Sequence, residues 1–370
     1  MRYINELEGL RGIMALWVVV GHSLAGLPLM HPRVPPSLLN IYAVDVFIIL
    51  SGFVIFFMID NKKQSYPVFI TQRFFRIFPV YIFALIASAI LIDFTEESLN
   101  VLALSPFTAR RLEIINNYQS NPSLHFLFHS LLLQGIIPEN FLPDTAYTLL
   151  GQAWSVSVEW QFYLIAPVLF MLIRGIYNKY NCLLLCVIAS LIIILNGNFA
   201  HGFIGKNLSL FSVGFATFFF YKNYSERITA IQLFYLYAAI SFISFLFLRK
   251  GMIPIFIWAT VFYFTILKQK YNNNSLLASF LDSKPVLFLG RISYSIYMVH
   301  MILLFFVLRI CHEIDMPLSL KYFVVPLLTI VVSIGVSALT HKYIEKPMIK
   351  LGKRLTSKQN KATPSNIIPQ

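Results

Sequence analysis

Ten predominantly apolar runs divide the chain, and charged residues are rare within them. A helix needs roughly 17–25 mainly apolar residues to cross the hydrocarbon core of a bilayer. Runs of this kind lie near residues 9–28, 41–59, 77–93, 156–173, 181–197, 207–221, 229–248, 251–267, 292–310 and 322–344. The sequence therefore predicts an all-α, polytopic integral membrane protein with about ten transmembrane helices.

The composition excludes several classes of soluble protein. The chain is 58% hydrophobic and 12% charged, against roughly 45–50% and about 25% in soluble domains. A cytosolic enzyme, a nucleic-acid-binding protein and a disordered scaffold are excluded on this ground. The net charge of +13 sits in short clusters between apolar runs, and no basic stripe follows the pattern of a phosphate backbone. We expect no nucleic-acid partner.

The distribution of basic residues predicts the orientation of the chain. With ten spans and a cytoplasmic N-terminus, 21 of the 29 Lys and Arg residues fall on the cytoplasmic side. Basic residues are enriched in cytoplasmic loops, so this orientation is favoured over its inverse. Both termini are predicted to be cytoplasmic, and the chain is predicted to be a multi-pass protein of the cell inner membrane.

Two segments fall outside the predicted spans. Residues 94–155 contain no clean span, and we expect an external loop with interfacial or re-entrant helices that covers a site. The membrane domain is predicted to extend over residues 1–348. Residues 349–370 are predicted to form a basic, disordered cytoplasmic tail, which is polar and contains proline from Thr356 onwards.

The first predicted span contains two ionisable residues, Arg11 and His22. They are eleven positions apart, which is close to three helical turns, so both lie on one face and about 16 Å apart along the axis. Ionisable groups inside spans are costly and mark functional sites. His22 could accept a proton within the membrane, or it could be satisfied by a hydrogen bond to a neighbouring helix.

Two carboxylates lie in later spans. Asp45 opens V-D-V-F-I-I-L-S-G-F, and we expect His22, an arginine or a hydroxyl as its partner. In the same segment, Gly52 is assigned to helix packing. Glu159 lies four residues after Ser155 in W-S-V-S-V-E-W, so the two face the same way. Glu159 could act as an acid or base, orient His22, or pair with an arginine.

Arg73 and Arg76 are three residues apart in R-F-F-R-I-F-P-V-Y and project from one face. Paired guanidinium groups beside aromatic rings suit a phosphorylated nucleotide. A flank that only sets membrane orientation is the alternative. We favour the phosphate contact because both residues are arginine rather than lysine.

Weaker signals complete the candidate site. Tyr297 and His300 share a face by their i, i+3 spacing, and we include both, with Trp154 and Ser155, as candidate substrate-binding residues. An aromatic belt at the interface is the alternative explanation for Trp154. His125 and His129 have a metal-like spacing, but no Glu follows His125 as in H-E-x-x-H. We predict no metal site.

Five motifs, taken together and in order, resemble the membrane acyltransferase-3 family. They are E-G-L-R-G with Arg11 ten residues before His22, V-D-V-F-I-I-L-S-G-F, R-F-F-R-I-F-P-V-Y, W-S-V-S-V-E-W-Q-F-Y-L and G-R-I-S-Y-S-I-Y-M-V-H. They extend from Glu8 to His300, over most of the chain. Each motif alone is weak evidence, and the ordered set is specific.

The resemblance implies a membrane domain of about ten helices that takes an acyl group, usually acetyl, from cytoplasmic coenzyme A. The acceptor it implies is a carbohydrate hydroxyl on the outer side, as in O-antigen, capsule or exopolysaccharide. It also implies that His22 and Arg11 form the essential pair and that Arg73 and Arg76 contact coenzyme A. In this scheme His22 acts as general base, and Glu159 or Asp45 holds the imidazolium. A covalent acyl intermediate remains a competing route.

Some family members continue into a soluble SGNH esterase-like domain, which takes part in the final transfer. Only about two dozen residues follow the last predicted span here, so we expect direct transfer to a lipid-linked or nascent glycan, or transfer through a separate glycan-assembly partner. A second copy of the chain is a further candidate partner. A transporter or flippase, and a non-catalytic subunit of a glycan-assembly complex, are the rival functions.

Overall fold

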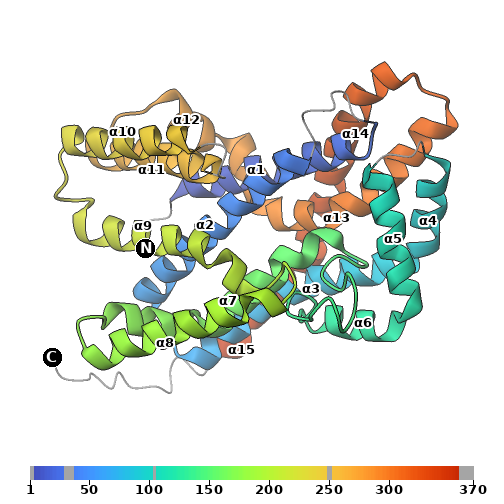
Figure 1. The fold of residues 1–370 in the computed structure, drawn as a ribbon. Helices are drawn as coiled ribbons and strands as arrows, with labels where there is room; N and C mark the ends of the chain where they lie inside the picture. The colour runs from blue at the N-terminus through green and yellow to red at the C-terminus, as the bar shows by residue number, and fades with distance from the viewer. Residues whose placement is uncertain (1–3, 29–36, 103–105, 248–251, 358–370) are drawn as a thin grey trace.

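A computed structural model describes residues 4–28, 37–102, 106–247 and 252–357, and every regular element in these ranges is a helix. Each of the ten predicted spans coincides with one of the longer helices (Figure 1). These are α1 (Asn5–Ala25), α2 (Ser37–Lys62), α3 (Tyr66–Ile90), α7 (Trp154–Arg174), α8 (Lys179–Leu195), α9 (Leu208–Tyr224), α10 (Ala230–Leu246), α11 (Ile253–Tyr271), α13 (Lys284–Glu313) and α14 (Leu318–Thr340). The predicted all-α class is confirmed.

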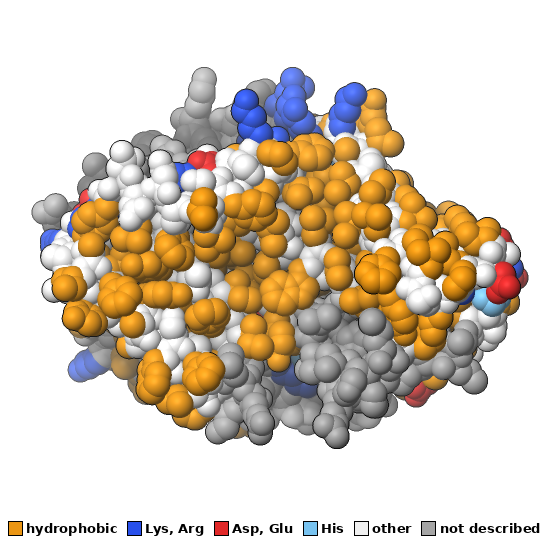
Figure 2. Space-filling model, turned by 90° about the horizontal axis from the view of Figure 1, so that it is seen from above, with side chains coloured by type: hydrophobic (Ala, Val, Ile, Leu, Met, Phe, Trp, Pro, Cys, Tyr) orange, Lys and Arg blue, Asp and Glu red, His pale blue; other side chains and the backbone are white. Residues whose placement is uncertain are grey.

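Six segments of the described chain are long and apolar enough to cross a membrane. They are α1, Asn40–Lys62 of α2, α3, Gly151–Arg174, α13 and Leu318–Ser357. Shorter apolar helices lie at Lys179–Ile192 and Ala230–Leu246. Hydrophobic side chains cover most of the described surface in Figure 2, while Lys and Arg gather at one rim. The chain is therefore a polytopic membrane protein.

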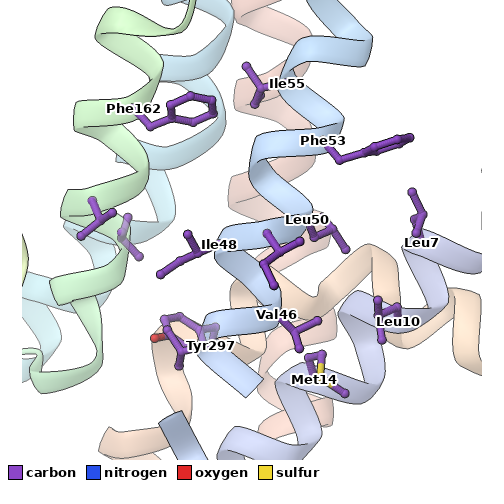
Figure 3. Packing of buried hydrophobic residues seen from close by; sticks show 14 of the residues in the cluster. Leu7, Leu10, Met14, Val46, Ile48, Leu50, Phe53, Ile55, Phe162 and Tyr297 are labelled. Carbon is purple, nitrogen blue, oxygen red and sulfur yellow. The ribbon is translucent and has the colours of Figure 1, made fainter. Parts of the chain in front are cut away.

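The helices α1, α2 and α13 form the centre of the molecule (Figure 1). Leu10 and Met14 of α1 pack beside Val46 and Leu50 of α2, and Ile48 points from α2 toward α7 (Figure 3). The helices α9 to α11, with the short α12 (Leu276–Leu281), lie to one side of this centre. The apolar stripes of the central helices thus bury one another rather than facing lipid.

Glycine permits the close contact between α2 and α9. A Cβ at Gly52 would lie 2.8 Å from the carbonyl oxygen of Phe211 and would touch the Cα of Gly214. A Cβ at Gly214 would in turn meet the backbone of Ile49 and Phe53. The two backbones touch because neither position has a side chain. The assignment of Gly52 to helix packing is confirmed.

The segment without a clean span folds into three short helices at one side of the molecule, which we call the cap (residues 92–150). They are α4 (Ile92–Val101), α5 (Pro106–Ser120) and α6 (Pro122–Ser130), followed by turns. His129 is fully buried here; its Nε2 lies 2.9 Å from the carbonyl oxygen of Thr145, and its own carbonyl accepts from the Tyr81 hydroxyl at 2.8 Å. Thr148 joins it to His125. These bonds tie the cap to α3.

The prediction of a disordered tail from residue 349 is wrong for residues 349–357. A π-helical turn, His341–Glu345, continues α14 into α15 (Lys346–Ser357). Helix α15 packs on α3 through Gly352, which lies against the Phe75 ring, and Thr356, which accepts from the Gln72 amide at 2.9 Å. A basic amphipathic helix resembles a disordered tail in composition, because only one face of it is buried. Residues 358–370 lie outside the described residues.

Acidification is expected to loosen the cap through His129. Burial lowers the pKa of His129 to about 3, whereas an unfolded histidine titrates near 6.5. The folded state therefore binds fewer protons, and its stability is lost as the pH falls below about 6.5, by up to about 1.4 kcal/mol per pH unit. The protection of the cap amides against hydrogen exchange, corrected for the intrinsic exchange rate at each pH, should be lower at pH 5 than at pH 7.5. Replacement of His129 by Gln should reduce that difference, and equal protection of the wild-type cap at both pH values would contradict the assignment.

Substitution of Gly52 by Ala should destabilise the fold by about 1–3 kcal/mol, because the added methyl forces α2 and α9 apart. Gly335→Ala is the matched control, since a Cβ at Gly335 of α14 meets no atom within 4 Å. Thermal unfolding in detergent is the measurement. If the Gly52→Ala variant had the same melting temperature as the control, the separation of α2 and α9 would not destabilise the fold, and the prediction would be wrong.

Candidate active site

Two adjoining cavities lie between the central helices. The inner cavity, of about 570 Å³, is lined by Arg11, Phe47, Ile48, Leu50, Ser51, Ser155, Val156, Glu159, Phe211, Ser293, Tyr294 and Tyr297. The vestibule, of about 880 Å³, is lined by Glu8, Arg11, Leu50, Ser51, Val54, Ile55, Arg73, Arg76, Glu159, Tyr163, Arg291, His341, Glu345 and Ile349. The two spaces share Arg11, Leu50, Ser51 and Glu159. A polar path therefore runs from the vestibule into the helix bundle.

Arg73 and Arg76 both line the vestibule, as their spacing on one face of α3 predicts. The Arg73 guanidinium lies over the ring of Tyr163, 5.7 Å from its centroid. Its Nε is buried and has no hydrogen-bond partner within the described part of the chain. Arg291 of α13 lines the same space. The vestibule thus presents several guanidinium groups to an anionic ligand.

Two carboxylates, Glu159 and Glu345, lie among the basic residues that line the vestibule. Glu159 accepts hydrogen bonds from the Ser51 hydroxyl at 3.2 Å and from the Tyr163 hydroxyl, and its charge acts on both Arg73 and Arg76. Glu345 accepts from the Ser295 hydroxyl at 2.8 Å and lies 3.1 Å from Nδ1 of His341. The partners of Glu159 are a serine and a tyrosine, with arginines nearby. Glu159 therefore does not hold His22.

His22 is paired with another histidine. Its Nδ1 lies 2.9 Å from Nε2 of His300, and the two rings stack with centroids 5.1 Å apart. Nδ1 of His300 lies 2.9 Å from the carbonyl oxygen of Tyr297, so in the neutral ring this nitrogen carries the proton. Nε2 of His300 is then the acceptor, and Nδ1 of His22 donates to it. This network leaves Nε2 of His22 with a lone pair that can accept a proton.

Tyr297 lies between the inner cavity and the histidine pair. Its ring centroid is 5.9 Å from that of His300, and it forms part of the cavity wall. Its hydroxyl donates to the carbonyl of Gln152 at 3.0 Å and lies 2.8 Å from the Ser155 hydroxyl. The structure thus brings together Ser155, Tyr297, His300 and His22 from three helices.

Two of the candidate residues lie apart from this group. Asp45 is half-buried and forms no hydrogen bond or ion pair within the described ranges, so the expected pairing with His22 or an arginine is not found. Trp154 packs against His201, with centroids 4.5 Å apart, and lines neither cavity. Both residues lie on helices that contribute to the cavities, but neither lines them.

Sequence reasoning missed four charged residues of this region. Three of them, Glu8, Arg291 and Glu345, line the vestibule. Arg291 is the second residue of G-R-I-S-Y-S, and Glu345 lies between lysines in K-Y-I-E-K. The charge of Arg111 of the cap acts on His22, and Arg111 donates to the Tyr147 carbonyl at 3.1 Å. Burial lowers the pKa of Arg111 to about 10. Its only sequence signal was an arginine pair in an apolar segment.

No group of three His, Cys, Asp or Glu residues in the described ranges could hold a metal ion. His125 and His129 instead bind hydroxyl and backbone groups of the cap. The chemistry that this arrangement supports is proton transfer at His22, which lines neither cavity itself and is connected to the inner one through His300 and Tyr297.

Comparisons with known proteins agree with the motif pattern. The chain is 23% identical over 388 aligned positions to the O-acetyltransferase OatA of Staphylococcus aureus, covering 95% of this chain and 58% of that protein. It is 27% identical over 179 positions to the acyltransferase MdmB of Streptomyces mycarofaciens, covering 47% of this chain and 41% of the relative. The chain thus spans about half the length of these curated relatives. No solved structure matches it.

A family model described as an acyltransferase domain matches residues 4–342, which is nearly all of the region that forms the helices and both cavities. The chain therefore belongs to the acyltransferase-3 family.

Proposed function

We propose that this protein is a membrane O-acyltransferase that moves an acetyl group from cytoplasmic acetyl-coenzyme A to a hydroxyl of a cell-surface or lipid-linked polysaccharide. The observation that carries the proposal is an arginine-lined vestibule that adjoins an inner cavity, whose wall includes Tyr297, the neighbour of the His22–His300 pair. The names of the two relatives, an O-acetyltransferase and an acyltransferase, support it.

The vestibule fits the phosphorylated end of the donor. Coenzyme A carries several phosphate charges, and guanidinium groups bind phosphate oxygens in a bidentate manner. Arg73, Arg76 and Arg291 supply such groups, and the buried Nε of Arg73 still needs an acceptor. The slender pantetheine arm can then follow Ser51 into the inner cavity. This route brings the thioester toward Ser155 and Tyr297.

The histidine pair supplies the base. Nε2 of His22 removes the proton from the acceptor hydroxyl, whose oxygen attacks the thioester carbonyl carbon. The carbon–sulfur bond then breaks, and the coenzyme A thiolate takes the proton back from His22. An ester and free coenzyme A result. His300 fixes the orientation of His22 and accepts a stronger hydrogen bond while His22 is charged. Arg11, which lines both cavities, lies near the path of the acyl group.

The acceptor approaches from the side of the cap. Arg111 acts on His22 from this side, and its cavity of about 330 Å³ is also lined by Met301, which follows His300. The distribution of basic residues favours an orientation with the vestibule on the cytoplasmic side and the cap outside, which we adopt in this proposal. We propose O-antigen, capsule or exopolysaccharide precursors as acceptors, in the cell inner membrane, with glycan-assembly proteins or a second copy of the chain as candidate partners.

Replacement of His22 by Ala should strongly reduce transfer, because it removes the base that the proposal assigns to the acceptor hydroxyl. A loss of about 10²–10⁴-fold is typical for a general base. Cells or membranes supplied with labelled acetyl-coenzyme A are assayed for alkali-labile label in surface glycan, at matched membrane abundance of the variants. Normal acetylation by His22→Ala would overturn the assignment and favour a transporter, a flippase or a scaffold subunit.

The double variant Arg73→Gln/Arg76→Gln should raise the KM for acetyl-coenzyme A by about 10²- to 10⁴-fold, since each of the two lost charge-assisted bonds contributes about 1.5–3 kcal/mol. Excess donor should restore much of the rate, because these residues bind the donor but do not take part in the proton transfer. Arg309→Gln is the matched control, as Arg309 pairs with Glu313 away from the cavities. An unchanged KM in the double variant would place the donor elsewhere.

A further inference from the structure

Two lysines extend the lining of the vestibule toward its mouth. Ile55 of α2 lines the vestibule, and Lys62 lies seven residues later, two turns along the same face. Ile349 of α15 also lines it, and Lys353 lies four residues later on that helix. Both lysines are exposed. They therefore lie one or two turns beyond the vestibule residues of α2 and α15, two of the helices that line it.

The two lysines belong to one cluster with the arginine pair. The charges of Arg73, Lys353 and Arg76 all act on Lys62. Neither lysine forms an ion pair with any residue that the structure describes. The acid nearest to Lys62 in the sequence, Asp60, is bound to Lys222 at 2.5 Å. The mouth of the vestibule thus holds like charges close together without a counter-ion.

The balance of charge changes along the path. Within the vestibule, four arginines face three carboxylates: Arg11, Arg73, Arg76 and Arg291 against Glu8, Glu159 and Glu345. These groups leave the inner part with an excess of one positive charge, and Lys62 and Lys353 add two more at the mouth. Like charges that repel one another favour an anionic ligand over the empty state.

Helix α15 fixes the position of Lys353. Gly352 lies against the Phe75 ring, between Arg73 and Arg76 in the sequence of α3. One turn later, Thr356 accepts from the Gln72 side chain at 2.9 Å. These contacts set the register of α15 on the helix that carries the arginine pair. Lys353 is thus part of a defined arrangement rather than a charge on a mobile tail.

We infer that Lys62 and Lys353 bind the ribose 3′-phosphate of the coenzyme A donor, outside the arginine pair that binds its diphosphate. The inference rests on the proposed function, because it assumes a coenzyme A thioester in the vestibule. The order of charges along the path matches the ligand, in which the thioester, the diphosphate and the terminal 3′-phosphate follow one another outward. A phosphate monoester carries up to two charges near pH 7, and lysine binds it as a point charge without the geometric demand of a guanidinium.

The test measures equilibrium binding of labelled coenzyme A and 3′-dephospho-coenzyme A to the full chain purified in detergent. The wild type should bind coenzyme A at least tenfold more tightly. Lys62→Gln and Lys353→Gln should each reduce this preference several-fold, and the double variant should bind both ligands about equally. Lys350→Gln is the matched control, because Lys350 is exposed on α15 but is directed about 100° away from Ile349. It should keep the wild-type preference.

Two results would overturn the inference. The first is equal binding of the two ligands by the wild type, and the second is an equal loss of affinity for both ligands in the lysine variants, which would indicate general attraction only. The acetyl-transfer assay separates these failures from failure of the proposed function. If the protein transfers acetyl groups but shows no preference for the 3′-phosphate, only the inference about the two lysines is wrong. If neither ligand binds, the inference and the proposed function are both wrong.

Discussion

Charged groups inside a membrane domain must be compensated by the protein itself, because lipid offers neither water nor counter-ions. In this protein, groups of opposite charge lie together around the vestibule. Arginines from α1, α3 and α13 and carboxylates from α1, α7 and the π-helical turn all face the vestibule. Removal of any one charge would leave its partners exposed to a low-dielectric environment. The helices are therefore arranged around the polar path, and the apolar residues that surround it complete the packing.

Close backbone contacts make this arrangement possible. Gly52 and Gly214 bring α2 against α9, and Ser51, one residue earlier, reaches Glu159 of α7 as a result. A bulkier residue at Gly52 would move Ser51 as well as α2. The same segment of α2 therefore serves packing on one face and the cavity on the other, as a period of 3.6 residues allows.

The sequence predicts those features that depend on local patterns. Hydropathy over about twenty residues located each long helix, and i, i+3 or i, i+4 spacing placed Arg73 with Arg76 and Ser155 with Glu159 on shared faces. Features that depend on distant contacts were not accessible in this way. His22 and His300 are 278 residues apart in the chain. The sequence therefore favoured a carboxylate, Glu159 or Asp45, as the partner of His22. Helix α15 was missed because its order depends on contact with α3, which its own composition does not reveal.

The identity of the partner of His22 affects its chemistry. A carboxylate beside His22 would stabilise the protonated ring and would add a second charge to a buried site. His300 is neutral in the hydrogen-bonded arrangement, because its Nδ1 donates to the Tyr297 carbonyl while its Nε2 accepts from Nδ1 of His22. It orients His22 without adding charge, and the charge of Arg111 acts on this neutral pair. His22 is therefore arranged to accept a proton briefly and to return it, which suits a reaction whose leaving thiolate must be protonated at the end.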